Sequence, residues 1–264
     1  MAIVLQLTDP HLLEDPLATL RGVPTRRTLV EVLALARARL PRIDRVVLTG
    51  DLAHDERPAS YLALRQALAP LASRARVLPG NHDDRAALHR VFPADAHGHD
   101  PDDPRRCFVD ELESWRLVGL DSQIPGKDAG RLGPRQLAWL RAILARAPRP
   151  TALFVHHPPV PTGHSVLDTM GLLDADALAA ELTRAPWVRL VAHGHIHRAT
   201  EHRLGVVPVL GTPSTAFQFP ARPELGPFEP LPPGCRVLHL DADGWHTEIL
   251  RLPGLRYPPV PRAS

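Results

Sequence analysis

The alternation of short apolar runs with longer amphipathic segments constrains this chain more than any other feature. Compact runs rich in Leu and β-branched residues, each ending in a turn signal, recur through the first two-thirds of the sequence and predict strands. These strands are expected at 2–7, 45–50, 75–80, 116–120, 151–157 and 188–194. Between them, patterns at 25–40, 56–74, 133–147 and 174–185 predict helices. Strand–helix–strand repetition predicts an α/β fold with a largely parallel sheet.

Three single residues refine the expected helix boundaries. Pro70 should kink or end the second helix, because its ring removes a hydrogen bond and clashes with the preceding turn. Pro134 and Asp174 occur where helix starts tolerate or prefer such residues.

The pattern changes near residue 201, where no further helix is indicated. Runs at 205–211, 235–241 and 244–250 predict strands without helices between them, so we expect a second sheet. The Pro-rich composition of 220–234 and 252–264 predicts a loop and a tail. No second core with its own helices is indicated, so we expect a single domain over 1–264 with a Pro-rich extension from about 220.

Composition and charge exclude several classes of protein. The formal net charge is +2 without a basic block, which argues against nucleic acid as a partner. No stretch approaches the roughly 20 apolar residues that span a bilayer, so we expect no membrane association. The N-terminal apolar run is too short for a signal peptide, and Cys107 and Cys235 form no CxxC pair. We therefore expect a cytoplasmic protein whose thiols stay reduced.

Polar side chains collect where the expected strands end. An Asp and a His follow the first strand, an Asp follows the second, an Asn-His-Asp sequence follows the third, and histidines end two later strands. The carboxyl ends of strands in an open α/β sheet are where ligands bind, so these residues should meet at one edge. The candidate ligands are Asp9, His11, Asp51, Asn81, His156, His195 and His197.

Local spacing supports a common site. The i, i+2 pairs Asp9/His11 and His195/His197 would each share one face if the chain stayed extended. Gly50, Gly80 and Gly194 directly precede three of the candidate ligands, and a residue without Cβ permits sharp turns and close backbone approach.

The number and type of donors indicate two metal ions. Seven side chains are too many for one tetrahedral zinc, but they suit two five- or six-coordinate divalent ions that share a bridging carboxylate. Imidazole and carboxylate together favour Mn, Fe, Zn or Co over Mg or Ca, and we expect Fe or Mn first. Two such ions about 3.5–4 Å apart are suited to hydrolysing phosphate esters.

A simpler interpretation is that these residues are structural. A single Asp or His after a strand is usually a cap or turn residue, and 15 histidines make an HxH by chance plausible. Five strand ends and three glycine–ligand pairs are harder to obtain by chance, so we interpret HGHIH (193–197) as part of a metal site. HGHD (97–100) lies in an Asp/Pro-rich loop and is treated as a coincidence. The histidines expected at the surface or in loops are His54, His89, His97, His99, His202, His239 and His246.

At the candidate ligands the chain resembles the calcineurin-like metallophosphoesterases. The ordered family pattern D-x-H, G-D, G-N-H-[DE], H and G-H-x-H occurs as DPH (9–11), GD (50–51), GNHD (80–83), HH (156–157) and GHIH (194–197). The match covers roughly residues 3–215. It implies a four-layer α/β/β/α sandwich of two mixed β-sheets flanked by helices.

The resemblance also implies a role for each matching residue. His82 would face the leaving group and, with Asn81, contact the substrate, and Asp83 would orient it. The first metal would take Asp9, His11, Asp51 and His197, and the second would take Asp51, Asn81, His156 and His195, with Asp51 bridging.

A narrower resemblance concerns 156–182 and 211–219, which look like the class III cyclic-nucleotide phosphodiesterases and related bacterial glycerophosphodiesterases. Segment 158–173 leaves the sheet beside His156, so we expect it to contact substrate through His164, Asp168 or Met170. We predict a metal-dependent phosphodiesterase that hydrolyses a small phosphodiester, with 3′,5′-cyclic AMP to 5′-AMP as the first choice. A glycerophosphodiester or a 2′,3′-cyclic nucleotide is the alternative.

Two other kinds of protein stay open. A non-catalytic scaffold on the same fold would use the C-terminal strands to bind partners, and loss of metal ligands or of His82 would favour it, but none is lost. A nuclease would need a basic groove interleaved with aromatics, which total only 5% of this chain. Assembly into a homodimer or larger homo-oligomer is left open.

Overall fold

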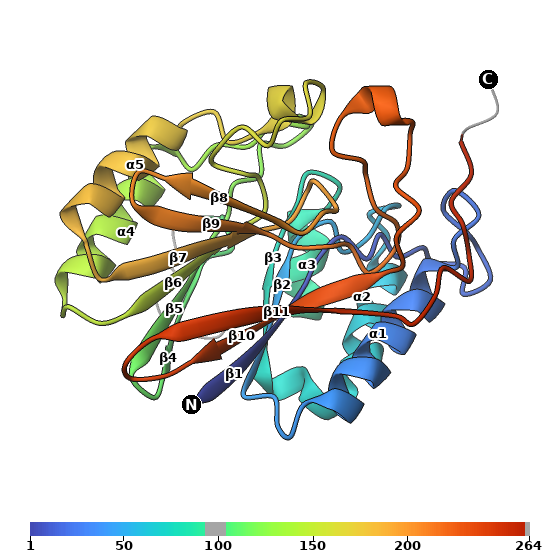
Figure 1. The fold of residues 1–264 in the computed structure, drawn as a ribbon, viewed down its shortest axis with the longest axis horizontal. Coiled ribbons are helices and arrows are strands. Elements are labelled where there is room, and N and C mark those ends of the chain that lie inside the picture. Colours follow the sequence, from blue (N-terminus) through green and yellow to red (C-terminus); the bar gives the residue numbers. More distant parts are fainter. Residues whose placement is uncertain (93–103, 262–264) are drawn as a thin grey trace.

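The computed structural model describes residues 1–92 and 104–261, and it contains two β-sheets packed face to face with helices over both outer faces (Figure 1). The first sheet has the strand order β11-β10-β1-β2-β3, and the second has the order β4-β5-β6-β7-β9-β8. Each sheet combines parallel and antiparallel pairs. The expected α/β/β/α sandwich of two mixed sheets is therefore confirmed.

The first sheet is built around three parallel strands. Strands β1 (Ala2–Leu7), β2 (Arg45–Thr49) and β3 (Ala75–Leu78) are parallel, and β10 (Gly234–Leu240) and β11 (Trp245–Arg251) continue the sheet antiparallel beyond β1. Its outer face is covered by α1 (Thr25–Arg39), α2 (Pro58–Ala67) and α3 (Arg85–Val91). Leucines of α1 and α2, including Leu29 and Leu64, form one core with this face of the sheet.

The second sheet has the same plan with antiparallel strands at both edges. Its strands are β4 (Phe108–Leu112), β5 (Trp115–Leu120), β6 (Thr151–Val155), β7 (Val188–His193), β8 (Thr200–Leu204) and β9 (Val207–Gly211). Helices α4 (Gly133–Ala145) and α5 (Ala175–Arg184) pack on its outer face, and their leucines form a second core. A third core lies between the sheets and joins Val4 and Val47 of the first to Phe154 and Leu190 of the second.

Most boundaries follow the sequence patterns closely. Helix α2 ends at Ala67, and a 3₁₀ turn, η1 (Ala69–Arg74), contains Pro70 in its first turn. Pro134 lies in the first turn of α4, as expected. Asp174 precedes α5, but its carboxylate accepts hydrogen bonds from Leu132 N (3.0 Å) and Gly133 N (2.8 Å), so it caps the start of α4.

The expectation of a separate C-terminal sheet is wrong. Strand β9 joins the second sheet parallel to β7, whereas β10 and β11 join the first sheet beside β1. All seven residues of β10 are buried, because this strand pairs on both sides and lies against the other sheet. The Pro-rich extension expected from about 220 thus includes two strands of the main fold, and β4, β8 and α3 were not expected from sequence.

Two further expectations concern the HGHD stretch and membrane-spanning segments. The HGHD stretch, with His97 and His99, lies outside the described residues. None of the helices in the described parts of the chain has the length and apolar character needed to span a bilayer.

A buried polar contact joins the two sheets where their strands end. Gln6 is fully buried in β1, and its Nε2 donates to Thr49 Oγ1 (3.0 Å) in β2 and to His193 O (3.3 Å) in β7. Its Oε1 accepts from Thr212 Oγ1 at 2.6 Å, in the segment after β9. A single amide therefore sets the spacing of strands that carry functional residues.

Replacing Gln6 by Leu should remove these bonds and leave the hydroxyls of Thr49 and Thr212 buried without partners, while His193 O keeps its bond from Thr212 N. An unsatisfied buried polar group costs about 1–3 kcal/mol, so we expect Gln6→Leu to lower the free energy of unfolding by roughly 2–4 kcal/mol. Urea denaturation at fixed metal concentration measures this. Gln66→Leu, on the exposed face of α2, is the control and should change stability by no more than about 0.5 kcal/mol. Equal effects of the two substitutions would contradict this role of Gln6.

Candidate metal centre

Sharp backbone turns bring the candidate ligands together after the strands end. Five of them have left-handed backbone: φ is 51° at Asp9, 45° at His11, 51° at Asp51, 69° at His195 and 48° at His197. Positive φ is uncommon outside glycine, and such strain concentrates at functional sites. The chain is thus not extended at the two i, i+2 pairs; Asp9 and His11 still belong to one ligand group, whereas His195 and His197 do not.

Asp9, His11 and His197 form the first ligand group, with Asp51 beside them. His11 Nε2 lies 3.1 Å from His197 Nε2, and His197 Nε2 lies 3.4 Å from Asp9 Oδ1. Asp51 Oδ2 lies 3.6 Å from His11 Nε2. These four side chains come from three strand ends and face one point.

The second ligand group combines an amide oxygen with two imidazoles. Asn81 Oδ1 lies 3.1 Å from both His156 Nε2 and His195 Nδ1. The two ring nitrogens are 3.2 Å apart, and Asp51 Oδ1 lies 3.5 Å from His156 Nε2. The two oxygens of Asp51 therefore face different groups, while His195 and His197 belong one to each.

These distances fit ligands arranged around two metal ions. Nitrogen and oxygen ligands about 2.1 Å from one ion lie roughly 3.0–3.4 Å apart at octahedral to tetrahedral angles. The contacts within each group span 3.1–3.6 Å. All seven side chains expected as ligands are brought together, and they divide as the family resemblance implies.

Hydrogen bonds and burial prepare the histidines to bind metal. Thr49 O lies 2.7 Å from His156 Nδ1 and Phe217 O lies 2.9 Å from His197 Nδ1, so these nitrogens carry the proton and Nε2 presents its lone pair. Burial holds the pKa of His11 and His195 well below its usual value, and the neutral imidazole is the form that ligates metal.

At Asp9 and His156, neighbouring charges oppose the effect of burial on the pKa. Burial raises the pKa of Asp9, but His197 and a hydrogen bond from Thr8 outweigh it and the pKa stays below its usual value. Burial lowers the pKa of His156, but the carboxylates of Asp51 and Asp9 and the hydrogen bond to Thr49 O together outweigh it, and the net shift is upward. Protons therefore compete with a metal ion at His156 as the pH falls.

Two glycines permit the close approach that the site requires. A Cβ on Gly80 would lie 2.1 Å from Asp51 Oδ1, and one on Gly194 would lie 2.0 Å from Thr8 Oγ1. Any side chain at either position would displace a ligand or the strand that carries it.

Asp83 holds the loop that carries Asn81 and His82. Its buried carboxylate accepts hydrogen bonds from Leu52 N (3.0 Å), Gly80 N (2.8 Å) and Tyr61 Oη (3.1 Å). Burial and then the Asp51 charge raise its pKa to about 7. Asp83 was expected to orient the His82 ring, but these contacts fix the backbone of the loops after β2 and β3.

The loop is also held from the second sheet. Gln123, which follows β5, donates from Nε2 to Gly80 O (2.8 Å) and to Asp83 O. Arg85 pairs with the buried Asp121 (2.8 Å), which joins the start of α3 to the same segment. No sequence motif indicated a role for Gln123, because that role depends on contact between its segment and a loop of the other sheet, which is distant in sequence.

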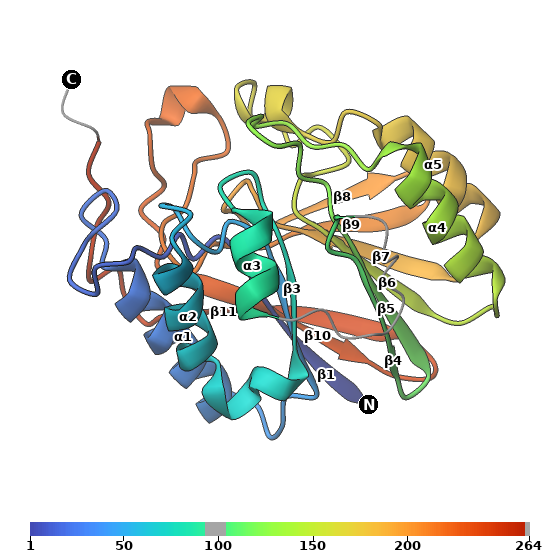
Figure 2. The ribbon, with the colours of Figure 1, turned by 180° about the vertical axis from the view of Figure 1, so that it is seen from behind.

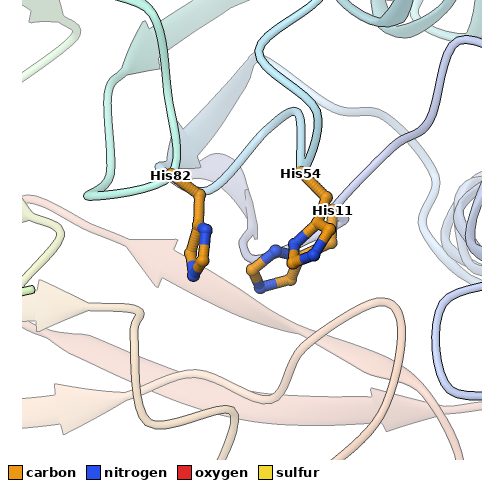
Figure 3. Close-up of side chains that lie close together, drawn as sticks. All are labelled: His11, His54 and His82. Carbon is orange, nitrogen blue, oxygen red and sulfur yellow. The ribbon is translucent and has the colours of Figure 1, made fainter.

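His82 lies at the mouth of the site beside two other imidazoles. Its backbone N donates to Asp51 Oδ1 (2.9 Å), and its ring centroid lies 5.2 Å from that of His11 and 5.0 Å from that of His54. Figure 3 shows the three rings directed from three loops into one space. His54 was expected at the surface or in a loop without function, but it is half-buried and lines the cavity above the ligands. Its position three residues after Asp51 was the available signal.

Among the described residues, the other histidines are buried or half-buried, except His246, which is exposed. His157 is buried beside His156 and His195, and Ser122 Oγ and Asp128 O engage its ring nitrogens at 2.8 and 3.0 Å, so it supports the ligands from behind. His239 was expected at the surface or in a loop, but it is buried in β10, where it stacks on His246 of β11. His89 lies on α3 and His202 on β8.

Segment 158–173 flanks the cavity, but two of its three expected contact residues point elsewhere. The Asp168 carboxylate accepts from Thr162 N (2.6 Å) and Gly163 N (3.1 Å), and His164 Nδ1 accepts from Leu167 N (3.2 Å). These polar groups stabilise the segment itself. Met170 lines the cavity, together with Leu167.

Comparison with known proteins agrees with this geometry. The family model for calcineurin-like phosphoesterases matches residues 3–199. The chain is 37% identical over 258 residues to the 3′,5′-cyclic adenosine monophosphate phosphodiesterase CpdA of Escherichia coli, covering 97% of this chain and 92% of that protein. It is also 37% identical over 247 residues to a probable cyclic nucleotide phosphodiesterase of Synechococcus, covering 93% and 91%.

Solved structures share the fold at low sequence identity. A dimetal phosphatase from Danio rerio superposes with a TM-score of 0.68 at 17% identity, covering 94% of this chain and 95% of that one. A purple acid phosphatase from yellow lupin superposes with a TM-score of 0.64 at 12% identity, covering 95% of this chain and 51% of that one. The ordered ligand set, the fold and the sequence match agree, and this chain belongs to the calcineurin-like phosphoesterase family.

Proposed function

We propose that this protein hydrolyses 3′,5′-cyclic AMP to 5′-AMP at a site that holds two divalent metal ions. The observation that carries the proposal is the division of the Asp51 carboxylate between two ligand groups at the bottom of a cavity. Relatives 37% identical over most of the chain are named as phosphodiesterases of cyclic AMP or cyclic nucleotides. The mixed imidazole and carboxylate ligands favour Fe or Mn, with Zn or Co as alternatives.

When bound, two such ions activate water and offset the charge of a phosphodiester. The side chains of the site set its net charge. Two ions of charge +2 against the carboxylates of Asp9 and Asp51 leave about +2, which attracts a phosphodiester monoanion. Asn81 supplies a neutral oxygen in place of a third carboxylate, and the site therefore keeps its positive charge.

His82 is placed to act on the leaving group. Its ring stands at the mouth of the cavity, outside both ligand groups, while its backbone N is anchored on Asp51. Opening a 3′,5′-cyclic diester expels a basic ribose alkoxide, which needs a proton as the P–O bond breaks. We propose that His82 donates that proton.

We further infer a cytoplasmic location. Cys235 is buried in β10, Cys107 contacts Gln136, and the described residues form no disulfide. This arrangement fits a reducing compartment.

The proposed reaction predicts a specific order of rates. The Mn- or Fe-loaded protein should hydrolyse 3′,5′-cyclic AMP faster than glycerophosphodiesters, 2′,3′-cyclic nucleotides and phosphomonoesters, with 5′-AMP as product, and a chelator should abolish the activity. Chromatographic product analysis across this panel measures the order. A faster rate on a glycerophosphodiester would replace the proposed substrate, and no turnover of any diester would favour a scaffold.

The bridging position of Asp51 makes it the least replaceable ligand. The wild type should bind roughly two metal equivalents. Asp51→Ala should lose occupancy at both groups, whereas Asn81→Ala should weaken mainly the second. Asp176→Ala, at the exposed start of α5, is the matched control and should leave metal content unchanged. Elemental analysis after Mn loading measures each, and retention of both ions by Asp51→Ala would exclude the bridge.

Leaving-group chemistry tests His82. General acid catalysis is typically worth about 10²–10⁴ in rate, so His82→Ala should lose cyclic AMP turnover by that order. An activated aryl diester releases a stable phenolate and should lose far less. Metal content should stay at the wild-type level, and His246→Ala, exposed on β11, should resemble wild type on both substrates. Equal losses on both substrates would instead mean that His82 holds the phosphoryl oxygens.

A further inference from the structure

The cavity above the two ligand groups has an aromatic wall that metal binding does not explain. The cavity measures about 480 Å³, a size typical of small-molecule sites. Ligand residues such as Asp51 and His195 lie at its bottom, and three phenylalanines line one side. These are Phe217, Phe219 and Phe228.

The three rings form an ordered cluster. Phe219 and Phe228 are nearly parallel, with ring centroids 6.2 Å apart and planes 13° apart. Phe217 meets both edge-on, at 74° and 75°, and it is 5% exposed. Phe219 and Phe228 are only half-buried, so Phe217 supports the cluster from within while the other two present ring surface to the cavity.

Backbone pairing holds the half-buried rings of Phe219 and Phe228 in place. Gln218 and Glu229 form an antiparallel bridge, with Glu229 N donating to Gln218 O at 2.9 Å. In antiparallel pairing the next residues inward, Phe219 and Phe228, lie opposite each other on one face. Gln218 is fully buried and donates to Ser214 O at 2.9 Å, which ties the bridge to the segment after β9. The rings are therefore positioned before any ligand binds.

The aromatic wall begins at the metal centre. The Phe219 ring stacks on the His197 imidazole, with centroids 4.5 Å apart and planes 28° apart. Across the cavity lie Leu167 and Met170 of η2 (Leu167–Met170). Figures 1 and 2 show the segment containing η2 and the segment containing η3 (Pro223–Leu225) standing on either side of the strand ends. A flat group attached to a phosphate at the metal centre would enter between an aromatic and an aliphatic wall.

We propose that Phe219 and Phe228 form a subsite that binds the nucleobase of the substrate by stacking. This proposal depends on the proposed function in one respect: the phosphodiester of the substrate must lie over the ligand groups. A nucleobase has a flat π-face that matches these rings, whereas a glycerol moiety has none. Stacking accepts every base, so the subsite favours nucleotides as a class and distinguishes weakly among bases.

Binding of 5′-AMP compared with ribose 5-phosphate isolates the base. Titration calorimetry on the metal-loaded wild type should show 5′-AMP binding about 10-fold or more tightly. In Phe219→Leu and Phe228→Leu that ratio should fall toward one, with metal content unchanged. Phe228→Tyr retains the ring and should retain the ratio, as should Leu225→Ala, whose exposed side chain lies outside the cavity lining.

The outcomes separate the subsite from the proposed reaction. Equal binding of both ligands to the wild type, or an undiminished ratio in Phe228→Leu, would overturn the subsite even if cyclic AMP is hydrolysed. Unlike Phe219, Phe228 does not stack on a ligand histidine. Phe228→Leu therefore tests the subsite even if Phe219→Leu fails to fold. A base-dependent ratio that collapses in both variants would support the subsite even if cyclic AMP proved not to be the substrate.

Discussion

The position of the Asp51 carboxylate is the constraint on which the rest of the site depends. Its two oxygens lie 3.6 Å from His11 Nε2 and 3.5 Å from His156 Nε2, so one side chain of the first sheet faces ligands from both sheets. Left-handed backbone at Asp51 and the absence of a side chain at Gly80 make that position attainable. The two sheets must therefore keep a fixed separation at their strand ends, and Gln6 and Gln123 span that separation with hydrogen bonds.

Electrostatics links metal binding to the local fold. Asp9 and Asp51 are 0% and 2% exposed, and burying two carboxylates is unfavourable unless positive charge compensates them. Neutral imidazoles at His11 and His195 do not provide that charge, whereas divalent ions do. Metal affinity and the stability of the strand-end loops should thus be coupled. Above the ligand groups, phenylalanines line one side of the cavity, which suits a ligand with a phosphate at one end and a flat base at the other.

Local sequence patterns predicted the strands, helices and turns that depend on residues close together in the chain. Strand and helix periodicity located β1, β2, α1 and α4 within a few residues, and glycines before Asp51, Asn81 and His195 indicated where the chain turns. Pairing between distant segments left no local pattern, so the placement of β10 beside β1 was not anticipated. His54 follows Asp51 by three residues, but only the approach of His11 and His82 shows that its ring lines the cavity. Asp168 has the residue type of a substrate contact, but its hydrogen bonds serve its own loop.

The most direct test of a shared Asp51 is electron paramagnetic resonance of the fully Mn-loaded protein. Two Mn ions bridged by one carboxylate and about 3.5–4 Å apart should give the spectrum of an exchange-coupled pair. That coupling should be absent when only one equivalent is bound. A six-line spectrum of isolated Mn at full loading would show that the two groups act as separate sites, and it would contradict the bridge.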